Sequence, residues 1–243
     1  MKKVMIGMSG GVDSSAAALI LRNQGYDVVG VTLEMFHDND IVCGEIHKKN
    51  NGNLSGAGDA EKVAEKLGFQ HMTVDMKDCF RKNVMKYFCE SYFSGKTPNP
   101  CIECNRHVKF GEMLKIAAEN GCDYIATGHY AVCEYDAERG RYLLKRSADR
   151  SKDQTYMLYS LTQEQLAHTL FPLGDMEKSA VRELAEKNGA NINRLKFKGK
   201  TAEAALFPTE NMWNLLRNLQ GKNQNRVIMW ICRGKSLAST RDI

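Results

Sequence analysis

The chain has 243 residues and a formal net charge of +5 at pH 7, a length that allows one α/β domain and a small appendage. No apolar run approaches the roughly 18 residues that cross a membrane. The basic start at residues 1–3 is followed by an apolar stretch that is too short for a signal peptide. Eight cysteines without a secretory signal predict reduced thiols and a cytoplasmic protein.

The positive charge is concentrated near the C-terminal end. Residues 191–243 carry ten Lys and Arg and three acidic residues, a net charge of +7, whereas residues 1–190 carry a net charge of −2. A basic segment beside a near-neutral domain is typical of a protein with a polyanionic partner such as RNA. A solvated or poorly folded tail explains the same composition equally well.

Apolar and polar patterns predict strands that alternate with helices along most of the chain. In chain order we expect a strand at 4–6, a helix at 16–21, a strand at 26–36, a polar loop at 37–58, a helix at 59–68, a strand at 71–76, a helix at 78–93, a loop at 94–105, a helix at 108–119, a strand at 123–127, a hairpin at 130–135 and 141–146, and helices at 154–170, 177–188 and 209–222. This order predicts an α/β fold with a doubly wound, mostly parallel sheet and a small helical or irregular C-terminal extension.

The loop after the first strand is rich in small residues. Gly10 and Gly11 let the backbone approach a ligand and adopt positive φ. Ser14 and Ser15 would lie at a helix N-terminus, where unpaired N–H groups and the helix dipole attract an anion. The spacing matches neither the Walker A pattern nor the dinucleotide G-x-G-x-x-G pattern. We therefore predict a phosphate-binding loop of another type, which resembles the pyrophosphate loop of enzymes that split ATP between its α- and β-phosphates.

A second motif reads TPNPCIECNRHVKF at 97–110. Two prolines bracket Asn99 and predict a rigid loop. Cys101 and Cys104 form a C-x-x-C pair, which is compatible with half a zinc site, a redox dithiol or a nucleophilic thiol with a neighbour. No second C-x-x-C or H-x-x-H pair accompanies it, and His37, Cys43 and His47 are loosely spaced in a polar loop. We therefore assign no metal-ligating residues.

The two motifs together resemble one family, the bacterial tRNA-specific 2-thiouridylases. The matching stretches, which come in the family's order and reach residue 189, are SGGVDSS at 9–15, TPNPCIECNRHVKF at 97–110, ATGHYA at 126–131, SKDQTYMLYSL at 151–161 and FPLGDMEKSAVRELAEKNG at 171–189. The resemblance implies an adenine nucleotide alpha hydrolase-like fold. It also implies a pyrophosphate-loop catalytic domain over 1–165, followed over 166–243 by a helical region and the truncated start of a tRNA-binding central domain.

The resemblance implies a sulfurtransferase that makes 2-thiouridine at the tRNA wobble position. Such an enzyme uses ATP and Mg²⁺ to adenylate O2 of the uridine, and a protein persulfide, charged by a cysteine desulfurase or a relay carrier, then delivers sulfur. The roles carried over are ATP binding for Gly7, Met8, Ser9, Gly10, Gly11, Val12, Asp13, Ser14, Leu33 and Gly128, catalysis for Cys104 and Cys101, contact with the target base for Asn99, Pro100 and Cys101, and contact with tRNA for Lys152, Asp153 and Gln154. Asp13 would also help to organise Mg²⁺. A disulfide bond is expected as well, and whether Cys101 and Cys104 are its two halves stays open.

The chain departs from the family in its sulfur chemistry. Many relatives carry Asp where this chain has Cys101, and Ala205 occupies the position of the persulfide cysteine within TAEAALFP at 201–208. Alanine cannot carry sulfur, and the later Cys232 lies in no matching context. We therefore expect adenylation to be retained and complete thiolation to be weak unless another thiol substitutes. A catalytically inactive protein that binds ATP or tRNA, and another adenylating enzyme of the same superfamily, remain alternatives.

Overall fold

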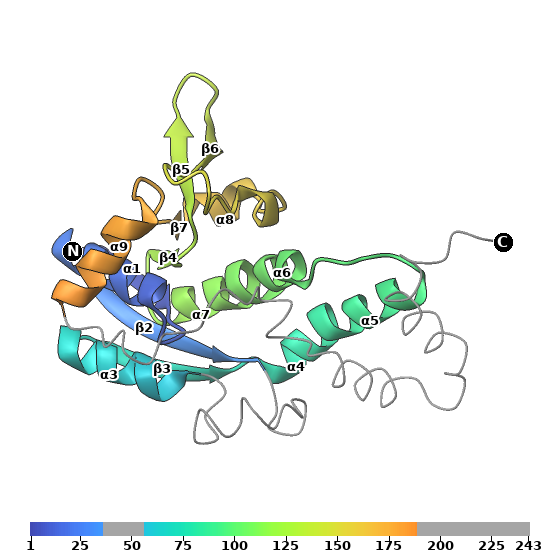
Figure 1. Cartoon of the computed structure of the whole chain (residues 1–243), viewed down its shortest axis with the longest axis horizontal. Helices are drawn as coiled ribbons and strands as arrows, with labels where there is room; N and C mark the ends of the chain where they lie inside the picture. The colour runs from blue at the N-terminus through green and yellow to red at the C-terminus, as the bar shows by residue number, and fades with distance from the viewer. Residues whose placement is uncertain (36–55, 189–243) are drawn as a thin grey trace, which may run out of the picture.

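A five-stranded parallel sheet forms the centre of the computed structural model, which describes residues 1–35 and 56–188 (Figure 1). The strands lie in the order β3 (Gln70–Asp75), β2 (Asp27–Glu34), β1 (Lys3–Gly7), β4 (Tyr124–Ala126) and β7 (Thr169–Leu170). Each neighbouring pair is parallel. The predicted α/β fold with a parallel, doubly wound sheet is therefore confirmed.

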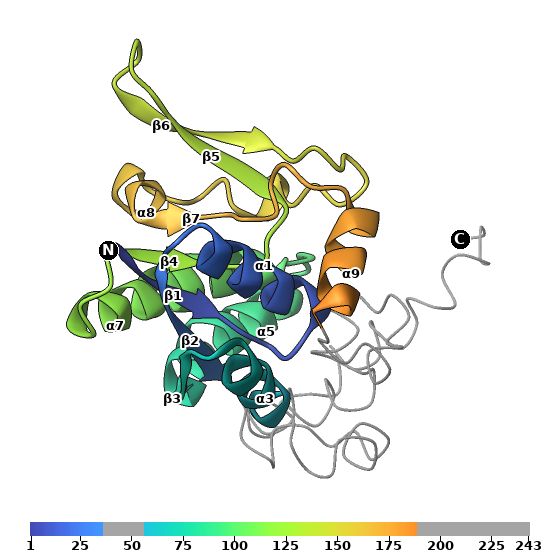
Figure 2. The same cartoon turned by 90° about the vertical axis from the view of Figure 1, so that its left-hand side faces the viewer.

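Helices cover both faces of the sheet (Figure 2). They are α1 (Val12–Asn23), α3 (Ala57–Leu67), α4 (Lys77–Phe80), α5 (Lys86–Phe93), α6 (Pro100–Glu103), α7 (Met113–Glu119), α8 (Gln163–Ala167) and α9 (Lys178–Lys187). Successive residues of a strand point to opposite faces. Accordingly, Val4 and Ile6 pack into the apolar cluster beneath α1 and α9, whereas Met5 packs into the cluster beneath α7. None of the described helices is long and apolar enough to span a membrane.

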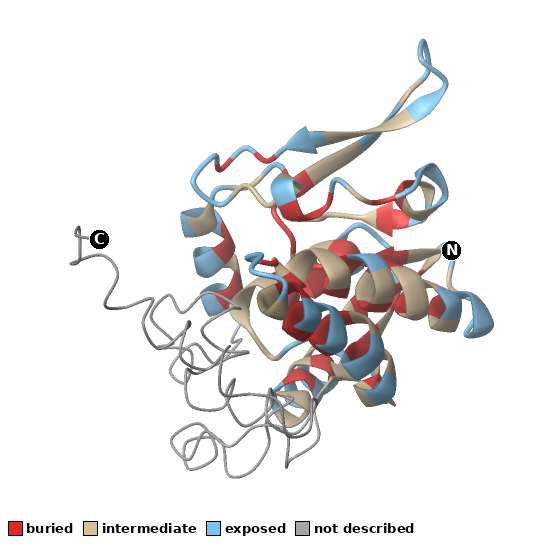
Figure 3. Ribbon diagram, turned by 90° about the vertical axis from the view of Figure 1, so that its right-hand side faces the viewer, coloured by how far each residue is buried: buried red, intermediate tan, exposed pale blue. Residues whose placement is uncertain are grey.

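The predicted hairpin is confirmed as β5 (Ala131–Asp136) and β6 (Arg141–Arg146), which pair antiparallel. It projects from the body of the molecule, and Figure 3 shows its tip as exposed. The chain returns to the main sheet after the hairpin. β7 pairs with β4 through Ile125 and Thr169, and α9 packs against α1.

The helix that carries the two cysteines begins earlier than predicted. We expected a loop over 94–105, but α6 starts at Pro100 and continues through a π-helical segment, Cys104–Glu112, into α7. Asn99 caps this helix, because its Oδ1 accepts a hydrogen bond from the Cys101 N–H at 3.0 Å. Proline is favoured at the first helical position because it lacks an N–H that would have no partner there. The second proline of the motif therefore starts a helix rather than stiffening a loop.

The expected helix over 154–170 is also wrong in part. The structure has a 3₁₀ turn at Thr155–Met157, the short helix α8 and then strand β7. Thr162 and Gln165 form a capping box that begins α8. The apolar residues of 154–170 predicted a single helix, so the sequence pattern gave no sign of β7, the strand at the edge of the sheet. The predicted helix at 209–222 and most of the predicted loop at 37–58 lie outside the described residues.

We predict that Asn99→Ala lowers the free energy of unfolding by about 1 kcal/mol, since the helix loses its N-terminal hydrogen-bond acceptor. Asn99→Ser keeps an acceptor and should retain most of that stability. Urea denaturation followed by circular dichroism measures both variants. Equal stability of the alanine variant and the unmodified chain would contradict the capping role.

Candidate nucleotide-binding site

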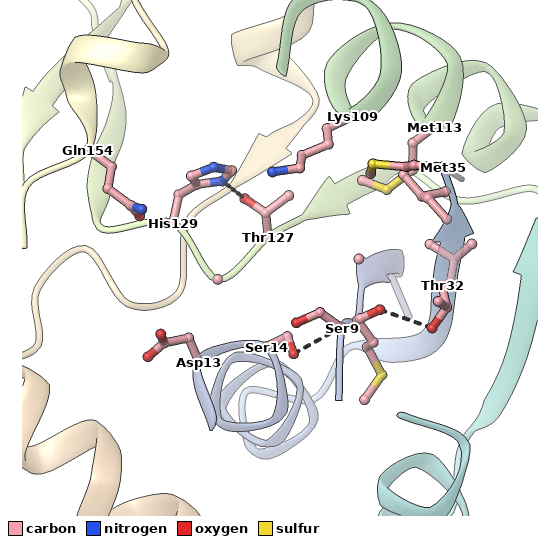
Figure 4. A pocket seen from close by; sticks show the side chains of 15 residues that line it. Ser9, Asp13, Ser14, Thr32, Met35, Lys109, Met113, Thr127, His129 and Gln154 are labelled. Carbon is pink, nitrogen blue, oxygen red and sulfur yellow. Dashed lines mark hydrogen bonds between the residues drawn. The ribbon is translucent and has the colours of Figure 1, made fainter. Parts of the chain in front are cut away.

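A cleft of about 290 Å³ opens at the carboxyl ends of β1, β2 and β4 (Figure 4). Its lining comprises Gly7, Met8, Ser9, Asp13, Ser14, Val31, Thr32, Leu33, Met35, Lys109, Met113, Thr127, Gly128, His129 and Gln154. β1 lies between β2 on one side and β4 on the other, so the chain reverses its direction of travel across the sheet at this point. Ligands of open α/β sheets bind at such switch points.

The loop between β1 and α1 forms one wall of the cleft. Gly10 has a φ of 70°, which favours glycine. The Ser14 and Ser15 hydroxyls donate to the Gly11 carbonyl at 3.1 and 2.9 Å, and Ser9 N–H donates to Ser14 Oγ at 3.3 Å. Gly11 supplies no side chain to cap α1. The first-turn N–H groups of α1 are therefore suited to an anion.

Gly128 brings the end of β4 against the start of α1. A Cβ atom at this position would lie 3.0 Å from the backbone C of Asp13 and 3.0 Å from the backbone N of Ser14. Backbone atoms cannot swing aside as the end of a flexible side chain can. Glycine at 128 is therefore required for the close approach of the two cleft walls.

Asp13 is held at the edge of the cleft by two donors. Its Oδ1 accepts a hydrogen bond from the Tyr130 hydroxyl at 2.8 Å and forms an ion pair with Lys178 Nζ. Burial and the adjacent Asp13 carboxylate raise the pKa of Tyr130, so this phenol stays protonated and donates. Asp149 accepts the Lys178 backbone N–H at 3.1 Å and so fixes the start of α9. The Asp13 charge is thereby balanced within the protein.

Within the segment 152–154, Gln154 lines the cleft, whereas Lys152 and Asp153 lie outside its lining. Gln154 lines the cleft and is clamped to Tyr130, because its N–H donates to the Tyr130 carbonyl and its Oε1 accepts the Tyr130 N–H, both at 2.9 Å. Lys152 is exposed, and Asp153 Oδ1 accepts the Ser147 N–H at 3.0 Å. Contact of this segment with tRNA stays a prediction.

The two cysteines of the second motif pack in different places. Cys104 is 7% exposed and lies in the apolar cluster between α4 and the π-helical segment, with its Sγ 3.9 Å from Sδ of Met35, which lines the cleft. Cys101 packs instead in the cluster beneath α7. Burial raises the pKa of the Cys104 thiol, and the charge of Lys109 partly offsets that rise.

The expected disulfide is wrong for the part of the chain that the structure describes. No disulfide joins Cys79, Cys89, Cys101, Cys104, Cys122 and Cys133 to one another. The side chains of Cys101 and Cys104 pack in different apolar clusters. Neither Asn99, Pro100 nor Cys101 is part of the cleft lining. Their contact with the target base stays a prediction.

Part of the cleft lining has no role in the sequence-based prediction, namely Val31, Thr32, Met35, Lys109, Met113, Thr127 and His129. His129 is 7% exposed, and its Nδ1 is hydrogen-bonded to Thr127 Oγ1 at 2.7 Å. Burial and the nearby charge of Lys109 hold the pKa of His129 well below its ordinary range. Both Lys109 and His129 lie within the recognised motifs, which was the only signal available for them.

Comparison with known proteins gives one family match. The family model described as tRNA methyl transferase HUP domain matches residues 2–199. The chain is 54% identical over 192 residues to the tRNA-specific 2-thiouridylase MnmA of Clostridioides difficile, covering 79% of this chain and 52% of that protein. It is 46% identical over 228 residues to the protein of the same name from Caldicellulosiruptor saccharolyticus, covering 93% and 62%. The chain spans about half the length of the first curated relatives it matches.

Structural similarity is weaker than sequence similarity. The crystal structure described as a predicted subunit of tRNA methyltransferase from Methanocaldococcus jannaschii is 23% identical, with a TM-score of 0.46, and the alignment covers 76% of this chain and 75% of that one.

We predict that the His129 ring stays neutral at pH 5.5 in the folded chain. An unfolded histidine takes up a proton near pH 6.5, so protonation favours the unfolded chain below that pH and stability falls. Long-range ¹H–¹⁵N NMR of the ring nitrogens measures the protonation state directly. Titration of His129 near pH 6.5 in the folded chain would show that the cleft does not exclude its charge.

We also predict that Asp149→Asn lowers the melting temperature at pH 7 and that the difference shrinks towards pH 3. The Ser151 hydroxyl, followed by the Lys178 N–H, holds the pKa of Asp149 below its ordinary value. The stability contributed by the carboxylate is therefore present above about pH 4 and is lost as pH falls through the lowered pKa. Asp175→Asn, at an exposed position, is the control. A pH-independent difference would point to lost packing rather than lost charge.

Proposed function

This chain belongs to the tRNA methyl transferase HUP domain family, and we propose that its cleft binds ATP and adenylates a tRNA uridine for conversion to 2-thiouridine. The observation that carries the proposal is the glycine-rich loop at the switch point of the sheet, where the start of α1 packs closely against Gly128 and both line the cleft. Proteins that share about half of the aligned residues are named tRNA-specific 2-thiouridylases. The reaction named for those relatives requires activation of an unreactive carbonyl.

The residues of the cleft fit ATP. The first turn of α1 offers N–H groups to the phosphates, and the tight packing of Gly128 leaves a backbone surface where a side chain would intrude. Leu33, at the end of β2, lines the part of the cleft proposed for adenine. Mg²⁺ usually keeps several waters and binds through phosphates and one or two carboxylates. Asp13 is the carboxylate of the lining that would assist it.

The proposed chemistry has two steps. Uridine O2 bonds to the α-phosphorus as the bond to the β-phosphate oxygen breaks, and pyrophosphate leaves with the electron pair. The terminal sulfur of a donor persulfide then bonds to C2 of the uridine, and AMP departs with the electron pair of the C2–O2 bond. A second thiolate attacks the donor-side sulfur, the S–S bond breaks with its electron pair on the sulfur that stays on uridine, and the thiolate and the donor cysteine are left joined in a disulfide. Cys104 is the thiol we assign to this second attack, with Cys101 three residues before it in the sequence. Because burial raises the pKa of Cys104, its proton must be removed before it attacks as a thiolate.

The partners in this proposal are a tRNA and a persulfide-bearing donor protein, met in the cytoplasm. The basic residues of 191–243 would favour the tRNA phosphates. Ala205, at the position expected for a persulfide cysteine, lies outside the described residues. Delivery of sulfur to the activated uridine therefore depends on another thiol or on the donor itself.

The test is pyrophosphate release on addition of ATP and tRNA. We expect release to require both, and Gly128→Ala to slow it by about 100-fold, since a displacement of about 1 Å at the reacting groups has an effect of that size. Glu138→Ala, at an exposed position in the turn of the hairpin, is the control. Binding of ATP and tRNA without release would favour a non-catalytic binding protein.

A companion assay separates activation from thiolation. With a persulfide donor present, Ala205→Cys should increase 2-thiouridine formation and leave pyrophosphate release unchanged. Mass spectrometry of digested tRNA measures the product. Full thiolation by the unmodified chain would show that a cysteine at 205 is not needed.

A further inference from the structure

Lys109 is a cation of the cleft without a described acceptor. It lines the cleft and is half-buried, and no hydrogen bond or ion pair joins its ammonium to another residue in the described ranges 1–35 and 56–188. The next lysine along the chain, Lys115, is instead paired with Glu112 at 2.7 Å. A half-buried ammonium that faces a cleft is suited to an anionic ligand.

The π-helical segment Cys104–Glu112 determines where Lys109 points. In a π-helical segment the backbone hydrogen bonds join residues five apart. Residues five apart therefore lie about one turn from each other and on roughly the same side of the helix. In an α-helix, residues five apart would face different sides. Lys109 thus lies one turn after Cys104, on the wall opposite the loop that carries Ser9 and Ser14 (Figure 4).

Among the residues that the structure describes, Lys109 is the only positively charged side chain in the lining of the cleft. His129 is kept neutral by burial and by Lys109 itself. Lys178 is engaged with Asp13, and its charge is balanced there. The phosphates of a nucleotide held by the N–H groups of the loop are negatively charged. Within this lining, Lys109 is the side chain that could contact that charge from the opposite wall.

We propose that Lys109 contacts the α-phosphate of the nucleotide from the wall opposite the glycine-rich loop. This inference rests on the proposed function and adds a catalytic residue to it. The loop holds the β- and γ-phosphates, so the α-phosphate lies nearer the helix that carries Cys104 and Lys109. As uridine O2 bonds to phosphorus and the bond to the leaving pyrophosphate breaks, the Lys109 ammonium stabilises the negative charge on the α-phosphate oxygens.

The experiment measures binding of α,β-methylene-ATP and of adenosine to the full chain by calorimetry without RNA. Lys109→Met should weaken binding of the analogue by about 10- to 100-fold, the range expected for a charged hydrogen bond, and leave adenosine binding unchanged. Lys109→Arg should recover most of the affinity for the analogue. Lys115→Met, on the same helix and away from the cleft, should match the unmodified chain. Circular dichroism confirms that each variant is folded.

Three results would overturn the inference. An equal loss for adenosine and for the analogue would assign Lys109 to the shape of the cleft. An unchanged affinity for the analogue, with weakened tRNA binding in a parallel titration, would assign it to an RNA phosphate. If the unmodified chain binds no analogue, the proposed function fails along with the inference, whereas failure of the inference alone leaves binding by the unmodified chain intact.

Discussion

The close approach of Gly128 to the first turn of α1 is the contact on which the rest of the site depends. β1 ends in a loop that must bend sharply into α1, and β4 ends beside it at the switch point of the sheet. A Cβ atom at residue 128 would lie only 3.0 Å from the backbone N of Ser14, so no side chain fits between them. At this contact the wall of the cleft is backbone, and the helix N-terminus beside it, rather than a cluster of charged side chains, is what suits the cleft to an anion.

The residues to which the proposed reaction assigns different roles lie on opposite faces of the sheet and meet at one edge. Its α1 face supplies the loop and the network of Asp13, Tyr130 and Lys178, in which each charge is balanced. The opposite face supplies the helix that begins at Pro100 and carries Cys104 and Lys109. The proposed reaction needs groups that activate the substrate and a thiol that attacks it to lie close together. The carboxyl ends of parallel strands provide that closeness without placing both groups on one element.

Sequence reasoning predicted the elements whose signals are local. The apolar run of β1, the glycines of the loop and the alternation of strands and helices were sufficient for four strands of the sheet, whereas β7 lies in a segment predicted as helix. The start of the cysteine helix was missed because proline is compatible with both a loop and a first helical turn, and the Asn99 cap decides between them. The disulfide was wrong because packing of Cys101 and Cys104 in separate clusters depends on distant elements. The position of Lys109 in the cleft likewise depends on residues that tertiary structure brings together.

The most direct measurement is a crystal structure of the chain with α,β-methylene-ATP and Mg²⁺. The account predicts the β- and γ-phosphates at the first turn of α1, adenine near Leu33 and the α-phosphate within hydrogen-bond distance of Lys109 Nζ. Nucleotide bound elsewhere on the chain, or phosphates turned away from the glycine-rich loop, would contradict it.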